Sequence, residues 1–245
     1  MRYYDYNNSQ LENEADKLNF EFDKERLYKP KGIDVYDVVD FLGCTPDFLY
    51  LSPDQSVLGM TAYCDIPYLV WYPLNEIEEK FYAECVFNGL HPKKALIKKD
   101  TIVIDRSLSE SNDRGRENFT CIHECFHKRL HTNCFKYRGG DYGHFSTKQH
   151  SSYVAGLRSN MTAIEKIERQ ANYCAAAFLM PRMAVKFLLM EILGLKNLPK
   201  KPIRHTDNFD AVIREMAKKF SVNYSPMKYR LQDLNLLDSS HLVDF

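Results

Sequence analysis

The chain has 245 residues, a length that fits one large domain or two small ones around a substantial buried core. Hydrophobic residues make up 44% of it, charged residues 27% and aromatic residues 13%. This composition excludes wholesale disorder and collagen-like or coiled-coil architectures. Lys and Arg together number 33, as do Asp and Glu, and the net charge is zero. No overall positive field is therefore available to hold nucleic acid or an anionic membrane.

The termini and cysteines predict a cytoplasmic protein. No apolar stretch follows Arg2, so no secretory signal is expected. No run of about 18 apolar residues is present, so no membrane-spanning helix is expected. The seven cysteines are an odd number, which favours free, mostly buried thiols over a disulfide framework.

The first hundred residues mix helical and strand patterns. Apolar residues spaced by three and four predict a helix over Gln10–Tyr28, and a second helix over Ile33–Leu42 ends at Gly43. β-branched and aromatic runs then predict three strands, at Gly59–Tyr63, Tyr68–Trp71 and Thr101–Asp105. The segment Glu76–Leu96 is ambiguous.

Helical patterns dominate the rest. One helix is predicted at Gly115–His131 and another at Thr162–Met180, ended by Pro181, with a polar connection of unusual length between them. A Pro- and Lys-rich joint, Lys196–His205, precedes two short helices, Phe209–Phe220 and Pro226–Leu237. We therefore expect an α+β catalytic region over residues 1–195 and a helical pair over 196–245 packed on the same domain.

The motif His123-Glu124-Cys125-Phe126-His127 is an H-E-x-x-H. On a helix, histidines four residues apart project from one face and can reach the same tetrahedral zinc ion. On a helical wheel the two histidines flank the buried stripe at the edge of the core. Glu124 comes slightly further round toward solvent, where it can touch a water at the metal.

A Cys/His structural zinc site is the rival interpretation, because Cys121, Cys125 and Cys134 interleave with the histidines. The wheel places Cys121 and Cys125 nearly opposite the histidines, so one ion cannot bind both pairs. His131, one turn after His127, is interpreted as a cation favourable to the helix dipole in preference to a group supporting the site.

A catalytic zinc ion needs a third protein ligand. Glu168 lies inside the apolar stripe of the second helix, where a carboxylate is costly unless it is paired or bound to metal. We prefer it to Glu165, which lies on the polar side, and to the loop residues Asp141, His144 and His150. Asn172, one turn later on the same face, is positioned to orient a ligating histidine.

Several ordered motifs resemble the ImmA/IrrE family of gluzincin-like zinc metallopeptidases. They are TIVIDRSLSES before FTCIHECFH, then ERQANYCAAAFLMP with its Glu, Ala-Asn and Leu-Met-Pro, together with Gly59-Met60-Thr61 and the last helices. The resemblance covers roughly residues 30–240. Two departures are Cys125-Phe126, where the family commonly has Leu-Gly, and the long connection between the two helices.

The resemblance implies a zincin-like fold, with a small mixed sheet packed on the H-E-x-x-H helix and one zinc ion per chain held by His123, His127 and Glu168. Glu124 would act as general base and acid. The loop residues Tyr142, His144 and His150 are the oxyanion candidates. Strand Gly59–Tyr63 or Thr101–Asp105 would offer an edge to an extended peptide.

The family setting implies a protein substrate such as a helix-turn-helix repressor of a phage or mobile element, with no membrane partner. Two other functions stay open. The C-terminal helical pair has the outline of a DNA-binding motif, with positive charge from Lys218, Lys219, Lys228 and Arg230. Alternatively, the zinc ion is structural or latent and the protein acts as a regulatory binding module.

Overall fold

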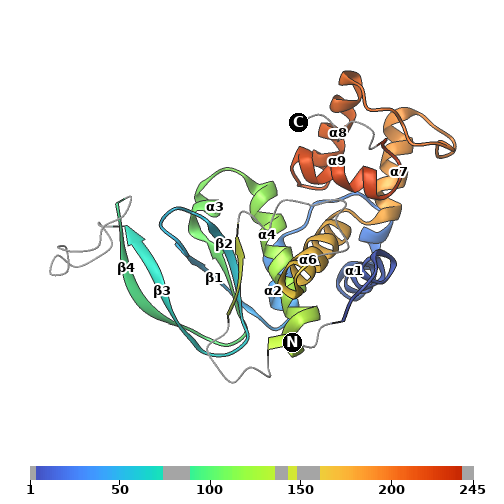
Figure 1. The fold of residues 1–245 in the computed structure, drawn as a ribbon. Helices are drawn as coiled ribbons and strands as arrows, with labels where there is room; N and C mark the ends of the chain where they lie inside the picture. The colour runs from blue at the N-terminus through green and yellow to red at the C-terminus, as the bar shows by residue number, and fades with distance from the viewer. Residues whose placement is uncertain (1–3, 74–88, 136–142, 148–160, 239–245) are drawn as a thin grey trace. The chain divides into compact units, whose positions relative to one another are not determined.

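The computed structural model describes residues 4–73, 89–135, 143–147 and 161–238, and the chain divides into two compact units (Figure 1). The first unit comprises residues 35–172 and the first five residues, and the second comprises residues 6–34 and the chain from 173 onward. Helix α6 (Ala163–Leu179) begins in the first unit and ends in the second. The structure confirms the expected α+β class.

The first unit contains a four-stranded sheet in the order β1-β5-β2-β6. Its strands are β1 (Thr45–Leu49), β2 (Val57–Ala62), β5 (Thr101–Asp105) and β6 (Gly143–Thr147). β1 pairs with β5 in parallel, whereas β2 runs antiparallel to both β5 and β6. A separate antiparallel pair is formed by β3 (Ile66–Pro73) and β4 (Leu90–Ile97).

The sheet order corrects one expectation. Strand β2 or strand β5 was expected to offer a free edge to a peptide, and this is wrong, because each of them pairs on both sides. The sequence showed where these strands lie but not the neighbours they acquire. β1 and β6 are the edge strands of this sheet.

Helices of the first unit lie beside this sheet. They are α2 (Val35–Phe41), α3 (Arg106–Glu110), α4 (Arg114–Phe126), η4 (His127–His131) and α5 (Thr132–Phe135). Asp113 caps α4 by accepting a hydrogen bond from the Arg116 amide at 3.1 Å. η4 is a single π-helical turn, a rare feature that often marks functional sites.

Side chains of strand β2 point alternately to the two faces of the sheet, so this strand contacts both the apolar core and helix α4. Met60 and Ala62 are buried in an apolar cluster that also contains Val103 of β5. Residues of the opposite parity, Gly59 and Thr61, meet the side chain of Glu124 on α4. The period of two along a strand thus separates residues that build the core from residues that contact the motif helix.

The second unit is helical. Besides the end of α6 it contains α1 (Asn8–Asp23), η1 (Lys24–Leu27), α7 (Arg182–Leu193), α8 (Asp207–Lys219) and α9 (Tyr224–Asp233). A capping box between Asn7 and Gln10 begins α1. α7 ends at Gly194, whose φ of 62° is the left-handed conformation that glycine adopts without strain.

A buried ion pair links two helices of this unit. Arg230 of α9 donates to both carboxylate oxygens of Glu12 on α1, at 2.8 and 2.6 Å, and the Tyr173 hydroxyl donates to the same carboxylate at 3.1 Å. Burial raises the pKa of Glu12, but the hydrogen bonds and charge of Arg230 outweigh it, so the net pKa is lowered. Among the described residues, none of the helices has the length and apolar character needed to span a membrane.

Candidate metal centre

His123, His127 and Glu168 meet in the first unit. The two histidines lie one turn apart, at the end of α4 and the start of η4, and Glu168 approaches from α6. Each histidine Nε2 lies 3.3 Å from a different oxygen of the Glu168 carboxylate, and the two Nε2 atoms lie 2.8 Å apart. Ligands about 2.0–2.1 Å from a tetrahedral zinc ion lie roughly 3.4 Å from one another. The two carboxylate distances match this spacing, and the histidine pair needs only a small opening.

The donor set suits a divalent metal. Two imidazole nitrogens and one carboxylate are the protein ligands of many catalytic zinc sites. The three ligand atoms lie within 4.8 Å of one another. Among the described residues, no other set of His, Cys, Asp and Glu side chains meets this geometry.

The whole cluster is buried, more deeply than the wheel predicts. His123, His127 and Glu168 are at most 3% exposed, and Glu124 is fully buried. The expectation that Glu124 turns toward solvent is wrong, because β2 covers that flank of α4. A wheel places residues on one helix but does not show which elements cover its faces.

Strand β2 holds Glu124 in place. The Thr61 hydroxyl lies 2.7 Å from Glu124 Oε2 and donates a hydrogen bond to it. A Cβ atom at Gly59 would lie only 2.7 Å from Glu124 Oε1 and 3.0 Å from Glu124 Cγ. Glycine at this strand position therefore leaves room for the close approach of the carboxylate.

His123 is oriented by Asn172. The Asn172 Oδ1 atom lies 2.9 Å from His123 Nδ1. An amide oxygen only accepts hydrogen bonds, so Nδ1 carries the proton and Nε2 presents its lone pair to the cluster. Burial lowers the pKa of His123, but Glu168, Glu124 and Asn172 raise it by more, so the net pKa is raised. The same carboxylates that attract a proton here also favour a metal cation.

The remaining predicted residues have other placements. Glu165 is exposed and caps the start of α6, accepting from the Thr162 amide at 2.6 Å. The backbone of His144 lies in β6 opposite Thr61. Asp141, Tyr142 and His150 lie outside the described residues.

The cysteines of the motif helix are buried apart from the ligand cluster. Cys121 Sγ lies 3.9 Å from the Val35 carbonyl at the start of α2. Burial is the main cause that raises the pKa of Cys125 well above its ordinary value, which keeps this thiol protonated. The geometry therefore places no thiolate among the metal ligands.

Sequence reasoning missed the groups behind His127. For His131, a cation favourable to the helix dipole was preferred to a group supporting the site, yet it is 1% exposed and its Nδ1 lies 3.0 Å from His127 Nδ1. Its Nε2 lies 3.0 Å from Gln170 Oε1 on α6. Gln170 is a polar residue in a buried helix face, the same signal that identified Glu168, and this signal could have identified Gln170 too.

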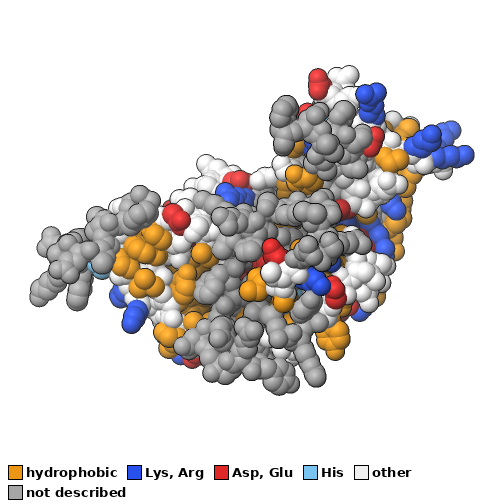
Figure 2. Space-filling model, in the orientation of Figure 1, with side chains coloured by type: hydrophobic (Ala, Val, Ile, Leu, Met, Phe, Trp, Pro, Cys, Tyr) orange, Lys and Arg blue, Asp and Glu red, His pale blue; other side chains and the backbone are white. Residues whose placement is uncertain are grey.

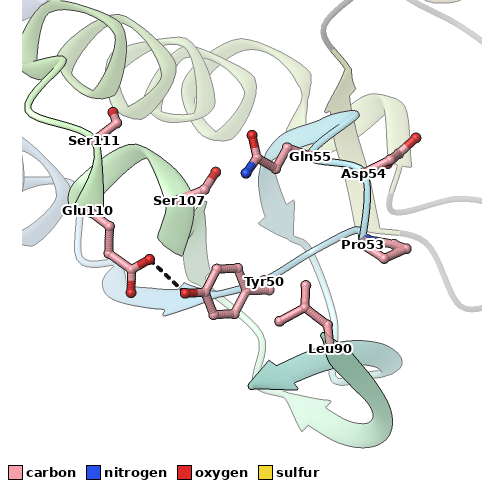
Figure 3. Close-up of a pocket in the computed structure, with 8 residues that line it drawn as sticks. All are labelled: Tyr50, Pro53, Asp54, Gln55, Leu90, Ser107, Glu110 and Ser111. Carbon is pink, nitrogen blue, oxygen red and sulfur yellow. Dashed lines mark hydrogen bonds between the residues drawn. The ribbon is translucent and has the colours of Figure 1, made fainter. Parts of the chain in front are cut away.

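A surface cavity of about 450 Å³ lies elsewhere in the first unit. Tyr50, the loop of Pro53–Gln55, Leu90 and residues of α3 line it (Figure 3). The Tyr50 hydroxyl donates to Glu110 at 2.6 Å, and Arg106 pairs with the same carboxylate at 3.0 Å. None of the residues of the metal cluster lines this cavity.

We compared the chain with known proteins. It matches no model of a known protein family, and no curated protein matches it.

Proposed function

We propose that this protein is a zinc-dependent endopeptidase with a zincin-like fold. The observation that carries the proposal is the meeting of the His123 and His127 Nε2 atoms with the Glu168 carboxylate, beside the buried carboxylate of Glu124. A purely structural metal site has no use for an additional carboxylate next to its ligands. The sequence resemblance to ImmA/IrrE metallopeptidases supports the same assignment.

His123, His127 and Glu168 would hold the metal. A zinc ion bound there supplies Lewis acidity, which makes water a nucleophile near neutral pH and polarises a substrate carbonyl. The protein contributes orientation: Asn172 sets the ring of His123, and burial of the cluster strengthens every electrostatic interaction within it.

Glu124 is the proton carrier. Its carboxylate accepts the proton of the attacking water as the oxygen adds to the peptide carbonyl carbon, and then gives that proton to the departing amine nitrogen. The Thr61 hydroxyl fixes Oε2 at 2.7 Å. This contact restrains the carboxylate in one rotamer while the proton moves.

The family resemblance extends the proposal to the substrate. We propose a cytoplasmic protein substrate, and a helix-turn-helix repressor is the first one to test. Tyr142, His144 and His150 are the candidates for the residue that donates a hydrogen bond to the oxyanion, as expected from the sequence.

Metal content tests the centre directly. We expect near-stoichiometric zinc by mass spectrometry in protein purified without added zinc, and loss of that zinc in Glu168→Ala. Glu165→Ala is the matched control, because it removes an exposed carboxylate from the same helix three residues earlier. A folded wild-type protein that contains no metal and rejects added zinc refutes the peptidase assignment.

Activity is tested separately. Incubation with a repressor encoded beside the gene should release discrete fragments, and Glu124→Gln should abolish them while retaining the zinc. Fragments that persist in Glu124→Gln would show that a contaminating protease produces them. Bound zinc without cleavage of any protein would favour a structural or latent metal.

DNA binding is a second candidate function, favoured by charge in the second unit. Figure 2 shows Lys and Arg side chains gathered where the loop between α7 and α8 lies, and Lys196, Lys200, Lys201 and Arg204 of this loop are exposed. Arg230, which was expected to supply surface charge, does not, because it is buried in the pair with Glu12.

The charge of this loop gives the test for DNA binding. A gel shift that weakens steeply with salt and is lost in Lys200→Glu/Lys201→Glu would support this function. The absence of any shift at low salt removes it.

A further inference from the structure

We propose that His131 and Gln170 are positioning residues that fix the tautomer of His127 and thereby set the affinity of the metal centre. A continuous chain of polar contacts within the first unit carries this inference. The Gln170 Nε2 atom donates to the Tyr4 carbonyl at 2.7 Å, and Gln170 Oε1 faces His131 Nε2 at 3.0 Å. His131 Nδ1 then faces His127 Nδ1 at 3.0 Å. The inference rests on the proposed metal site, and it does not require peptidase activity.

The direction of each hydrogen bond in this series follows from its first contact, between Gln170 and the Tyr4 carbonyl. A main-chain carbonyl only accepts, so the amide NH₂ of Gln170 must face Tyr4, and its oxygen must face His131. His131 therefore carries its proton on Nε2. In the neutral ring the Nδ1 atom is then an acceptor, and it takes the proton of His127 Nδ1.

These hydrogen bonds determine which nitrogen His127 presents to the metal centre. With its proton held on Nδ1, His127 presents the Nε2 lone pair toward Glu168 and His123. Asn172 imposes the same tautomer on His123. Two lone pairs 2.8 Å apart repel each other, and a cation between them removes that repulsion. The two supporting networks thus prepare the centre for a metal ion before it binds.

The series of hydrogen bonds from Gln170 to His127 begins at a backbone atom near the N-terminus. The Tyr4 side chain is 79% exposed, so its carbonyl provides the contact and its ring is not needed. A second contact of the same segment joins Asp5 to Lys166 of α6 at 3.2 Å. Lys166 lies on the same helix as Gln170 and pairs with Asp5, an exposed side chain, which makes it a useful control.

The test is the dissociation constant for zinc, measured by competition with a fluorescent chelator. We expect His131→Leu to weaken zinc binding by about 10- to 100-fold, the usual effect of removing a group that orients a metal ligand. His131→Asn supplies an amide oxygen close to the former Nδ1 position, so it should restore most of this affinity. Gln170→Leu should weaken binding by about 10-fold, and Lys166→Met should match the wild type.

Cobalt substitution gives a second readout. The ligand-field spectrum of Co²⁺ in the site should change in His131→Leu, because the ring of His127 loses its fixed orientation, and it should resemble the wild type in His131→Asn. As a control, thermal unfolding of the metal-free variants should show that each of them is folded.

Two results would overturn the inference. One is a zinc affinity and cobalt spectrum in His131→Leu equal to those of the wild type. The other is an equal loss in His131→Asn and His131→Leu, which would mean that packing matters and the hydrogen-bond acceptor does not. A wild-type protein that binds no zinc refutes the proposed function itself, and this is visible without any variant.

Discussion

Substitution of Gly59 by alanine perturbs Glu124, the proposed general base, without touching a proposed metal ligand. The added methyl group would lie 2.7 Å from Glu124 Oε1, whereas ordinary contacts begin near 3.4 Å. The carboxylate oxygen must therefore withdraw by about 0.7 Å if the strand does not move. A displacement of 1 Å at a reacting group lowers the rate by about 10²-fold, so we expect kcat/KM to fall by about 25-fold.

The fold should tolerate this change. Alanine in a strand interior gains roughly 0.5–1 kcal/mol over glycine through backbone entropy, which offsets the crowding. The melting temperature and the zinc content should stay near those of the wild type. Gly32→Ala is the matched control: its methyl group would crowd the Ser221 hydroxyl in the second unit, and it should leave kcat/KM unchanged. Full activity in Gly59→Ala, or loss of zinc together with activity, refutes the reasoning.

Four further outcomes are expected. Thr61→Val removes the hydrogen bond to Glu124, worth about 1.5–3 kcal/mol for a charged acceptor, and should lower kcat/KM about 10-fold or more, whereas Thr61→Ser should not. A zinc chelator should abolish cleavage, and added zinc should restore it. Glu12→Gln leaves Arg230 buried without its charge partner and should lower the free energy of unfolding by about 3–5 kcal/mol in urea titrations. Removal of Glu25 from its solvent-exposed pair with Lys29 should cost less than about 1 kcal/mol. Because the folded pKa of Glu12 is lowered from 4.5, its contribution is present above that pH and is lost as the pH falls below it. Melting curves between neutral and acid pH should therefore show a smaller loss of stability in Glu12→Gln than in the wild type.

The sequence predicted the helices of the centre because helical periodicity is local. His123 and His127 must share a face wherever α4 forms. Glu168 was recognisable as a carboxylate inside an apolar stripe, and the structure buries it at 3% exposure. The apolar stripe does not extend to the start of the helix, since Ile164 there is 53% exposed.

Elements that depend on distant partners were not predictable in the same way. The segment Thr45–Leu49 contains Pro46 and Asp47, residue types that are uncommon in strands, but it forms β1 by parallel pairing with β5. β4 lies mostly within the segment left ambiguous, and it is defined by its partner β3. Strand pairing adds hydrogen bonds that no local pattern contains.

The supporting residues of the centre show how one physical rule could have been used more widely. A buried polar side chain is costly unless it is hydrogen-bonded, and that argument selected Glu168 on α6. Asn172, which the sequence had already indicated, and Gln170, which it had not, are also polar and at most 5% exposed on the same helix. Each contacts one of the histidines of α4 and η4. His131 escaped the rule because it was interpreted only from its place one turn after His127, as a cation favourable to the helix dipole. The π turn that begins at His127 contains more residues per turn than an α-helix. A helical wheel drawn at 100° per residue therefore does not give the direction of the side chains after His127, including that of His131.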